Sequence, residues 1–396
     1  MHIVHLIVYI KEMVKTDLAE VIKTFGNDLS KQINLSPQQT KVLYHIGSCR
    51  TPLLGRHKKE VCDTCGTIVY RYNSCGDRHC PKCQHSKQIK WIEKLQKESL
   101  AVKHYHIIFT VPHSLNAICL WNKKLYYNLL FKSVWETLRS FGYTKYNIES
   151  GAIAVLHSWG QNLSLHPHIH CIVPAAGVNL KGEWKLIGKN DKYLYPVKQL
   201  SDVFKGKFLY FLQKKLKKAN HQGFEVQINK AFKTKWVVYC EAPLSGVKQV
   251  IKYLGQYTHR IAISNQRILG IYGQRVRFLA KDYRDNATVK KTQLDGSEFL
   301  RRFIQHILPK GFMRIRRYGI YNATTKRNLD LQFEQEKSGF DKLLEKKEQE
   351  DLKLEPPKVY HCPICKEGKL IVVKTYPKIR SPAGDLPEML RSLFKK

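Results

Sequence analysis

Two closely spaced pairs of cysteines constrain this chain more than any other feature. Cys62 and Cys65 form the first pair, with two residues between them. Cys80 and Cys83 form the second, which begins after 14 intervening residues. Two residues between cysteines allow both thiolates to reach one ion across a tight turn, and two such turns complete a tetrahedron. The spacing predicts that these four cysteines bind one structural zinc ion.

Further cysteines and histidines leave the full ligand set open. Cys75 and His79 lie between the two pairs. Together with His57 they supply a second site, replace one of the four ligands, or bind no metal at all. A tail pair, Cys362 and Cys365, has the same spacing, but a complete site there needs ligands from elsewhere in the chain. No open coordination position is indicated among the N-terminal cysteines, so the expected role of the zinc is structural.

The cysteines are expected to be reduced thiolates on a metal, because they are paired in a long chain without an export signal. The first ten residues are apolar but lack a basic leader and a small-residue cleavage site. No segment reaches the ~18 to 20 apolar residues that a membrane-spanning helix needs. The expected location is the cytoplasm, without a membrane partner.

The charge of the chain predicts a polyanionic partner. Lys and Arg number 68 against 32 Asp and Glu, so the formal net charge is +36. A soluble protein this basic repels itself unless a polyanion neutralises it, and nucleic acid is the commonest polyanion in a cell. Hydrophobic residues make up 43% of the chain, which is enough for a packed core and excludes disorder throughout.

The order of apolar and polar residues predicts an α+β fold, with an antiparallel sheet flanked by helices. Strands are expected near residues 105–111, 152–157, 168–173, 235–240 and 270–279. Helices are expected near residues 36–46, 89–102, 115–141, 199–218, 245–259 and 298–307, the first with Ser36 as its cap and Pro37 in its first turn.

Two histidines in the third strand are candidate metal ligands. Alternate residues of a strand face the same way, so His168 and His170 converge on one side of the sheet. Two imidazoles and a third polar group leave room on a divalent ion for phosphate oxygens. The candidates for the third ligand are His157, Gln256 and His259.

Two tyrosines are candidate nucleophiles. Ser245 is a suitable cap for a helix in which Tyr253 and Tyr257 lie one turn apart. Both hydroxyls are then able to address the same point, and a metal held by paired histidines polarises a phosphate for attack. The alternative is that both rings only pack in the core or at its rim.

Three segments together resemble the rolling-circle insertion-sequence transposases. They are residues 72–83 (YNSCGDRHCPKC), 157–170 (HSWGQNLSLHPHIH) and 253–265 (YLGQYTHRIAISN). Those transposases are HUH enzymes, named for a histidine–hydrophobe–histidine strand, and they carry two tyrosines on one helix. The motifs occur in the family's order and the resemblance covers about residues 40–325, whereas the tail matches only loosely.

The resemblance implies a single-strand DNA endonuclease and strand-transferase with a twisted antiparallel sheet flanked by helices. His168 and His170 would hold Mg²⁺ or Mn²⁺, and Tyr253 or Tyr257 would attack the phosphate to give a 5′-phosphotyrosine link and a free 3′-OH. The DNA partners would be single-stranded element ends and target. The implied organisation is a helical segment (1–56), a zinc-binding and DNA-binding module (57–100), an HUH-type transposase core (101–325), and a linker with a basic tail (326–396).

Other functions remain open at this point. A rolling-circle replication initiator would use the same histidines and tyrosines. A zinc-dependent DNA-binding regulator would explain the charge and the cysteines but not the tyrosines beside a metal strand. A tyrosine recombinase would leave the paired histidines unexplained. No Gly-x-x-x-x-Gly-Lys-Ser/Thr loop occurs in the chain, which argues against a built-in ATPase.

Overall fold

The computed structural model describes residues 16–84, 102–187, 193–221, 223–240, 262–282, 285–325, 360–377 and 386–394. They form an α+β structure whose sheets are all antiparallel, as the sequence predicts. Two separate hydrophobic cores hold most of this structure together. Within the described residues, no helix is both long enough and apolar enough to cross a membrane.

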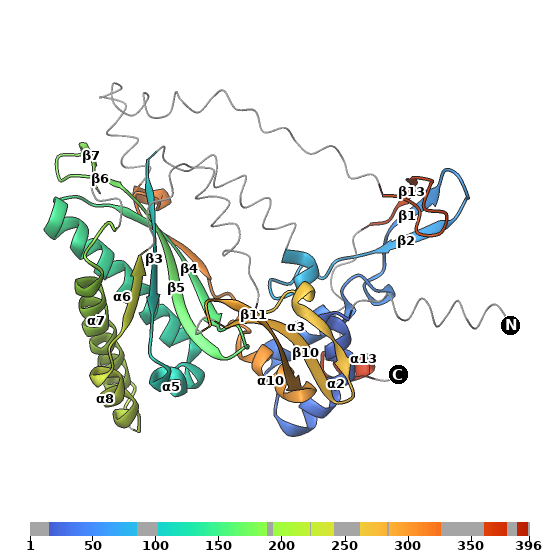
Figure 1. Ribbon diagram of the computed structural model, residues 1–396, viewed down its shortest axis with the longest axis horizontal. Coiled ribbons are helices and arrows are strands. Elements are labelled where there is room, and N and C mark those ends of the chain that lie inside the picture. Colours follow the sequence, from blue (N-terminus) through green and yellow to red (C-terminus); the bar gives the residue numbers. More distant parts are fainter. Residues whose placement is uncertain are drawn as a thin grey trace.

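A five-stranded sheet with the order β12-β4-β5-β3-β8 forms the centre of the first core (Figure 1). Its strands are β3 (His104–Thr110), β4 (Gly151–Trp159), β5 (Leu165–Pro174), β8 (Val237–Cys240) and β12 (Ile315–Gly319). The four strands predicted between residues 105 and 240 are all present. Strand β12 was not predicted as a strand, because its run of arginines reads only as a basic segment.

Among the described residues, four helices accompany this sheet: α5 (Asn116–Trp121), α6 (Lys123–Phe141), α7 (Val197–Lys218) and α8 (Glu225–Lys233). Figure 1 shows α6 and α7 along one side of the sheet. The single helix predicted at 115–141 is two helices, because the backbone of Asn122 is not helical (φ −146°, ψ 83°) and its side chain accepts a hydrogen bond from the Leu125 N–H at 3.0 Å.

Alternate residues of the central strands point into this helical layer. The first core buries Tyr105, Ile107 and Phe109 of β3, Ala152, Ala154 and Leu156 of β4, and Ile169, Cys171 and Val173 of β5. Because successive side chains of a strand point to opposite faces, the residues between them lie on the other face of the sheet. That face carries the histidines described below.

The second core joins the two ends of the chain. It combines α2 (Leu18–Gln32), α3 (Pro37–Ser48), α10 (Gly296–Gln305), the C-terminal α13 (Leu386–Phe394) and the sheet β11-β10-β9. That sheet consists of β9 (Ile268–Tyr272), β10 (Arg275–Asp282) and β11 (Thr288–Asp295). The one strand predicted at 270–279 is therefore a hairpin, because a tight turn at Gly273 divides it.

Helix α3 begins where the sequence predicts. The Ser36 side chain accepts a hydrogen bond from the Gln39 N–H, the Gln39 side chain accepts one from the Ser36 N–H, and Pro37 stands in the first turn. This reciprocal pair satisfies two N–H groups that the end of a helix would otherwise leave unpaired.

Smaller elements complete the described structure. A third sheet, β13-β1-β2, contains β1 (Arg56–Cys62), β2 (Ile68–Tyr72) and β13 (Leu370–Thr375), and Figure 1 shows it at one end of the molecule. Strands β6 (Ala176–Val178) and β7 (Trp184–Leu186) pair as a hairpin. Short helical turns lie at Pro52–Leu54, His113–Leu115, Gly142–Tyr146 and Asn265–Arg267. The helix predicted at 89–102 lies almost entirely outside the described residues.

His306 connects the second core to the central sheet. It follows α10 and is buried, its Nε2–H donating to the Leu163 carbonyl at 3.0 Å while Nδ1 accepts from the Ser158 hydroxyl at 3.2 Å. Burial lowers the pKa of His306 from its ordinary 6.5 to about 4. The ring is therefore neutral in the folded protein at pH 7.

We expect this neutral histidine to make folding stability depend on pH. Below pH 6.5 the unfolded chain binds a proton that folded His306 does not take up until about pH 4, so stability falls as the pH drops through that range. The loss attributable to His306 is about 2 kcal/mol between pH 7 and pH 5. Urea unfolding of the wild type and of His306→Gln at both pH values measures it, because acid effects on other groups are common to both chains. An equal loss in both proteins would contradict this role.

Candidate metal centres and active site

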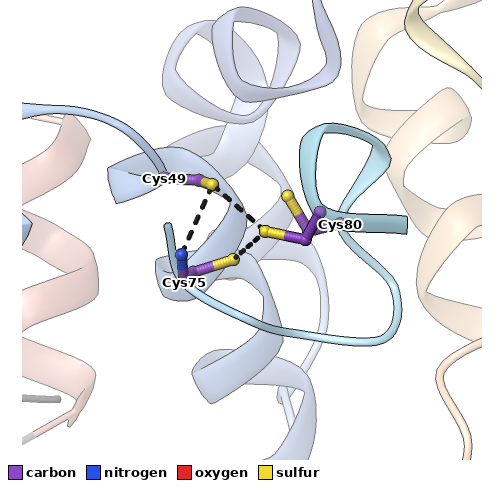
Figure 2. Close-up of side chains that lie close together, drawn as sticks. Cys49, Cys75 and Cys80 are labelled. Atoms are coloured by element: carbon purple, nitrogen blue, oxygen red, sulfur yellow. Dashed lines mark hydrogen bonds between the residues drawn. The ribbon is translucent and has the colours of Figure 1, made fainter. Parts of the chain in front are cut away.

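The first candidate metal centre contains Cys49, Cys75, Cys80 and Cys83. Their sulfur atoms all lie within 4.8 Å of one another. The Sγ atom of Cys83 is 3.6 Å from that of Cys49 and 3.6 Å from that of Cys75. Tetrahedral zinc with Zn–S bonds of ~2.3 Å requires sulfur atoms about 3.8 Å apart. Figure 2 shows Cys49, Cys75 and Cys80 directed toward one another. The four cysteines therefore have the spacing of a structural zinc site.

The second centre contains Cys62, Cys65, Cys362 and Cys365, again with all sulfur atoms within 4.8 Å of one another. The Cys62 and Cys365 sulfurs are 3.6 Å apart, as are those of Cys65 and Cys362. The sequence does not identify the other ligands that the tail pair needs. The structure places the tail pair beside the first N-terminal pair.

The prediction that Cys62, Cys65, Cys80 and Cys83 share one ion is therefore wrong in its grouping. Cys62 ends β1 and Cys65 lies in the turn that leads to β2, whereas the second pair follows after the chain has returned along β2. Strand β1 has seven residues, which at about 3.3 Å per residue places the two pairs roughly 20 Å apart. Spacing along the sequence does not reveal that a hairpin separates them.

The loop residues left open by the sequence have different roles. Cys75 is a member of the first centre. His79 is not, because Nδ1 pairs with the Asp77 carboxylate at 2.9 Å and Nε2 accepts from the Leu308 N–H at 3.2 Å. His57 belongs to neither cysteine centre as the structure describes them. Cys49 was missed because it has no second cysteine at short spacing, and only the fold brings the end of α3 to this loop.

Hydrogen bonds lower the pKa of at least one cysteine in each centre, whereas those from neighbouring thiols raise the pKa of Cys75 and Cys80. The neighbouring thiols of Cys49, Cys75 and Cys80 hydrogen-bond to the sulfur of Cys83 and lower its pKa. In the second centre, the hydroxyl of Thr67 lies 3.0 Å from the Cys65 sulfur and lowers the pKa of Cys65 to about 6. The thiolate is the form that binds zinc, so each centre contains at least one ligand already biased toward it.

The first centre fixes a loop that connects three parts of the protein. Asp77 lies in this loop and accepts from His45 of α3 at 3.2 Å and from His79 at 2.9 Å. Burial would raise the pKa of Asp77, but the hydrogen bonds from these two histidines hold it below its ordinary value. The adjacent Arg78 donates to the carbonyl of Phe312, a residue of the first core. The cysteines therefore hold the junction between the N-terminal helices and the first core.

The third candidate centre lies on the sheet face opposite the helical layer. It consists of His157 of β4 and His168 and His170 of β5, whose ring nitrogens lie within 4.8 Å of one another. His157 and His168 are direct partners across the two strands. Of the three candidates for a third ligand, the structure brings His157 to the pair. The other two, Gln256 and His259, lie outside the described residues.

The surroundings of these histidines determine which nitrogens face a metal. Nδ1–H of His168 donates to the carbonyl of His166 at 2.7 Å, which directs Nε2 to the centre. Nδ1 of His170 lies 2.8 Å from Nε2 of His106, and the two rings are stacked 5.1 Å apart. Burial lowers the pKa of His168 to about 4, so its imidazole is neutral at pH 7, as a metal ligand must be.

His106 is a functional candidate that reasoning from the sequence missed. It lies on β3 between the core residues Tyr105 and Ile107 and so faces the histidine side of the sheet. The alternation of the predicted strand was the signal that could have found it. Its Nε2 lies 2.8 Å from Nδ1 of His170, which holds the His170 ring in place.

The predicted nucleophiles, Tyr253 and Tyr257, and the helix predicted at 245–259 lie outside the described residues. The chain on either side of them is described. Strand β8 ends at Cys240 and pairs with β3, which carries His106. Ala262 and Ile263, where the description resumes, are buried in the second core.

Comparisons with known proteins identify the family. Residues 21–111 match the family model described as "Transposase zinc-binding domain", and residues 151–328 match the one described as "Putative transposase". Over 395 residues the chain is 36% identical to "Putative transposase y4qJ" of Sinorhizobium fredii (strain NBRC 101917 / NGR234), covering 92% of this chain and 97% of that protein. It is 26% identical over 279 residues to the transposase for insertion sequence element IS801 of Pseudomonas savastanoi pv. phaseolicola, covering 69% and 67%. No solved structure matches the chain.

The chain therefore belongs to this family of insertion-sequence transposases, and the resemblance seen in the sequence is confirmed. It is a DNA-binding enzyme of transposition with a zinc-binding domain. The zinc-binding model spans all four cysteines of the first centre. It spans Cys62 and Cys65 of the second centre but not the tail pair.

Cys49 provides the test of the first centre. Because binding of a structural metal is part of the free energy of folding, Cys49→Ser should lose one equivalent of zinc during dialysis against a chelator that the wild type withstands, and should unfold at lower temperature. Metal analysis and thermal unfolding measure both effects. The matched control is Cys119→Ser, a buried cysteine outside both centres, which should keep the wild-type zinc content. Full zinc retention by Cys49→Ser would show that Cys49 is not a ligand.

Proposed function

We propose that this transposase nicks and rejoins single-stranded DNA at the ends of a mobile element, using a tyrosine as nucleophile. The observation that carries the proposal is the convergence of His157, His168 and His170 on one face of the central sheet. Family membership supplies the substrate class, and the sequence supplies two tyrosines in the segment that follows the edge strand β8.

The three histidines are the residues that would hold a divalent cation. Their donor set fits Mn²⁺ better than Mg²⁺, because Mg²⁺ strongly prefers oxygen ligands whereas imidazole suits transition metals. When bound, the cation withdraws electron density from the non-bridging oxygens of the scissile phosphate. His106 keeps the ring of His170 oriented, and the carbonyl of His166 does the same for His168.

The tyrosines would perform the group transfer. The phenolic oxygen of Tyr253 or Tyr257 forms a bond to phosphorus while the bond from phosphorus to the 3′-oxygen breaks. The phenol gives its proton to solvent, and the departing 3′-oxygen takes one up. The 5′-phosphotyrosine link keeps the free energy of the phosphodiester, so attack by a 3′-OH reverses the step without ATP. Two tyrosines allow donor and target strands to be handled in turn.

Features near the histidines suit a single strand of DNA. Tyr239 of β8 is 54% exposed and pairs with Ile108 of β3, which in turn pairs with His170. The tyrosine thus faces the same side as the histidine, about 10 Å away across two strand spacings. An exposed aromatic ring stacks on an unpaired base, and the net charge of +36 neutralises the backbone.

The histidines should be required for cleavage but not for binding. The double variant His168→Ala, His170→Ala is expected to give no cleavage of single-stranded element-end DNA in Mn²⁺ or Mg²⁺. Its affinity for the strand should stay within about threefold of wild type, since binding depends on phosphate contacts and stacking. Gel assays of nicking and fluorescence anisotropy measure the two properties. His221→Ala, on the helical side of the sheet, is the control and should cleave normally. Cleavage by the double variant would refute the metal role.

The tyrosines should divide the reaction between them. Phenylalanine keeps the ring and removes only the nucleophile, so Tyr253→Phe with Tyr257→Phe should form no covalent protein–DNA adduct. Each single variant should lose complete strand transfer, and at least one should still cleave. Peptide mapping of the trapped adduct identifies the attacking residue. An adduct on Tyr272, which is exposed on β9, would contradict the two-tyrosine mechanism.

A further inference from the structure

The second cysteine centre joins residues from opposite ends of the chain. Cys65 and Cys362 are 297 positions apart and Cys62 and Cys365 are 303 apart, yet each pair of sulfur atoms is separated by 3.6 Å. None of the four forms a disulfide. Four sulfur ligands at this spacing match the tetrahedral thiolate set that selects zinc or iron.

The two halves of this centre have the same backbone geometry. Gly66 and Lys366, each directly after a cysteine pair, have φ angles of 68° and 64°. The Gly66 N–H donates to the Cys62 carbonyl at 3.1 Å, and the Lys366 N–H donates to the Cys362 carbonyl at 3.0 Å. A left-handed lysine costs about 1 kcal/mol or more, so it persists where the surrounding structure requires it.

Backbone amides also point at the sulfur atoms. The N–H groups of Cys65, Ile364 and Gly368 donate to cysteine sulfurs at 3.4 Å, the first two to Cys62 and Cys362 and the third to Cys365. Such donors stabilise thiolates that carry negative charge on a metal. A Cβ atom at position 368 would lie 2.3 Å from the Cys62 sulfur, so only glycine allows this approach. The tail and the hairpin therefore fit together as the two halves of one ligand cage.

Hydrophobic burial does not explain why the tail strand stays in place. Strand β13 pairs with β1, but Ile371, Val372 and Val373 are 53%, 44% and 55% exposed. A three-stranded sheet that buries so little apolar surface needs a metal or disulfide for stability. The four cysteines are the groups that could bind such a metal, and Cys62 lies directly opposite Leu370 in the β1–β13 register.

We propose that Cys62, Cys65, Cys362 and Cys365 bind a second structural Zn²⁺, which completes a zinc ribbon assembled from both ends of the chain. The ion fastens the C-terminal tail to the N-terminal zinc-binding domain. The tail has a second attachment beyond it, where Phe394 of α13 packs so closely on α2 that a Cβ at Gly26 would lie 2.3 Å from its ring. The nuclease chemistry proposed above plays no part in this inference.

Metal stoichiometry of the full chain tests the proposal. The wild type should contain two zinc equivalents. Cys362→Ser with Cys365→Ser should contain one, and so should Cys80→Ser with Cys83→Ser, because each pair belongs to a different centre. Wild-type metal content in the tail variant would overturn the proposal. A wild type with one equivalent that disappears in Cys80→Ser with Cys83→Ser would also overturn it.

Hydrogen exchange separates loss of this site from general unfolding. In Cys365→Ser, the amides of β13 that bond to β1 should lose their protection, whereas those of α6 should keep the wild-type rates. Chelation of the wild type should give the same pattern in β13, and added zinc should restore protection in the wild type only. Equal protection of β13 in Cys365→Ser and in the zinc-loaded wild type would show that the tail is held without a metal.

Discussion

The antiparallel pairing of β4 with β5 determines where the candidate histidine centre of this transposase lies. Ala154 and Leu156 of β4, with Ile169 and Cys171 of β5, fill the core beneath α6 and α7, and this burial sets the register of both strands. A slip of one residue would turn every core side chain outward and every histidine inward. The histidine centre is thus a consequence of packing on the opposite face. The three histidines lie on strands that pack against the core, as the proposed positioning of a phosphate requires.

The two cysteine centres hold together segments that are far apart in the sequence. The first holds the loop in which Asp77 bonds His45 of the N-terminal helices and His79, whose Nε2 accepts from the amide of Leu308. Because these contacts lie on both sides of the junction, we expect loss of zinc from this centre to release both. The zinc-binding domain therefore contacts the rest of the protein through the loop that its cysteines hold. The C-terminal tail contacts the N-terminal domain at two places, through α13 on α2 and through β13 on β1.

Much of the fold could be predicted from the sequence, because local rules decide it. The β-branched and aromatic runs indicate four strands, and the Ser36–Pro37 cap indicates the start of α3. The two-residue period of a strand is enough to place His168 and His170 on one face. Which cysteines share a metal centre could not be predicted from such local rules. The hairpin β1–β2 separates cysteine pairs that are close in sequence, and it brings Cys62 to Cys365 across 303 positions. Cys49 becomes recognisable only once the end of α3 is placed beside the other cysteines, and the alternation of β3 places His106 on a face of the sheet but not beside His170.

The most direct test of the account concerns the histidine centre itself, independently of any DNA cleavage. Mn²⁺ bound by imidazole shows magnetic coupling to the ligand ¹⁴N nuclei in pulsed electron paramagnetic resonance. We expect one Mn²⁺ per chain with ¹⁴N coupling from histidine, which His168→Ala with His170→Ala abolishes and which ¹⁵N-histidine labelling converts to the ¹⁵N pattern. Binding of Mn²⁺ with no histidine nitrogen coupling, or coupling that survives in the double variant, would contradict the assignment of these histidines as the ligands of the catalytic metal.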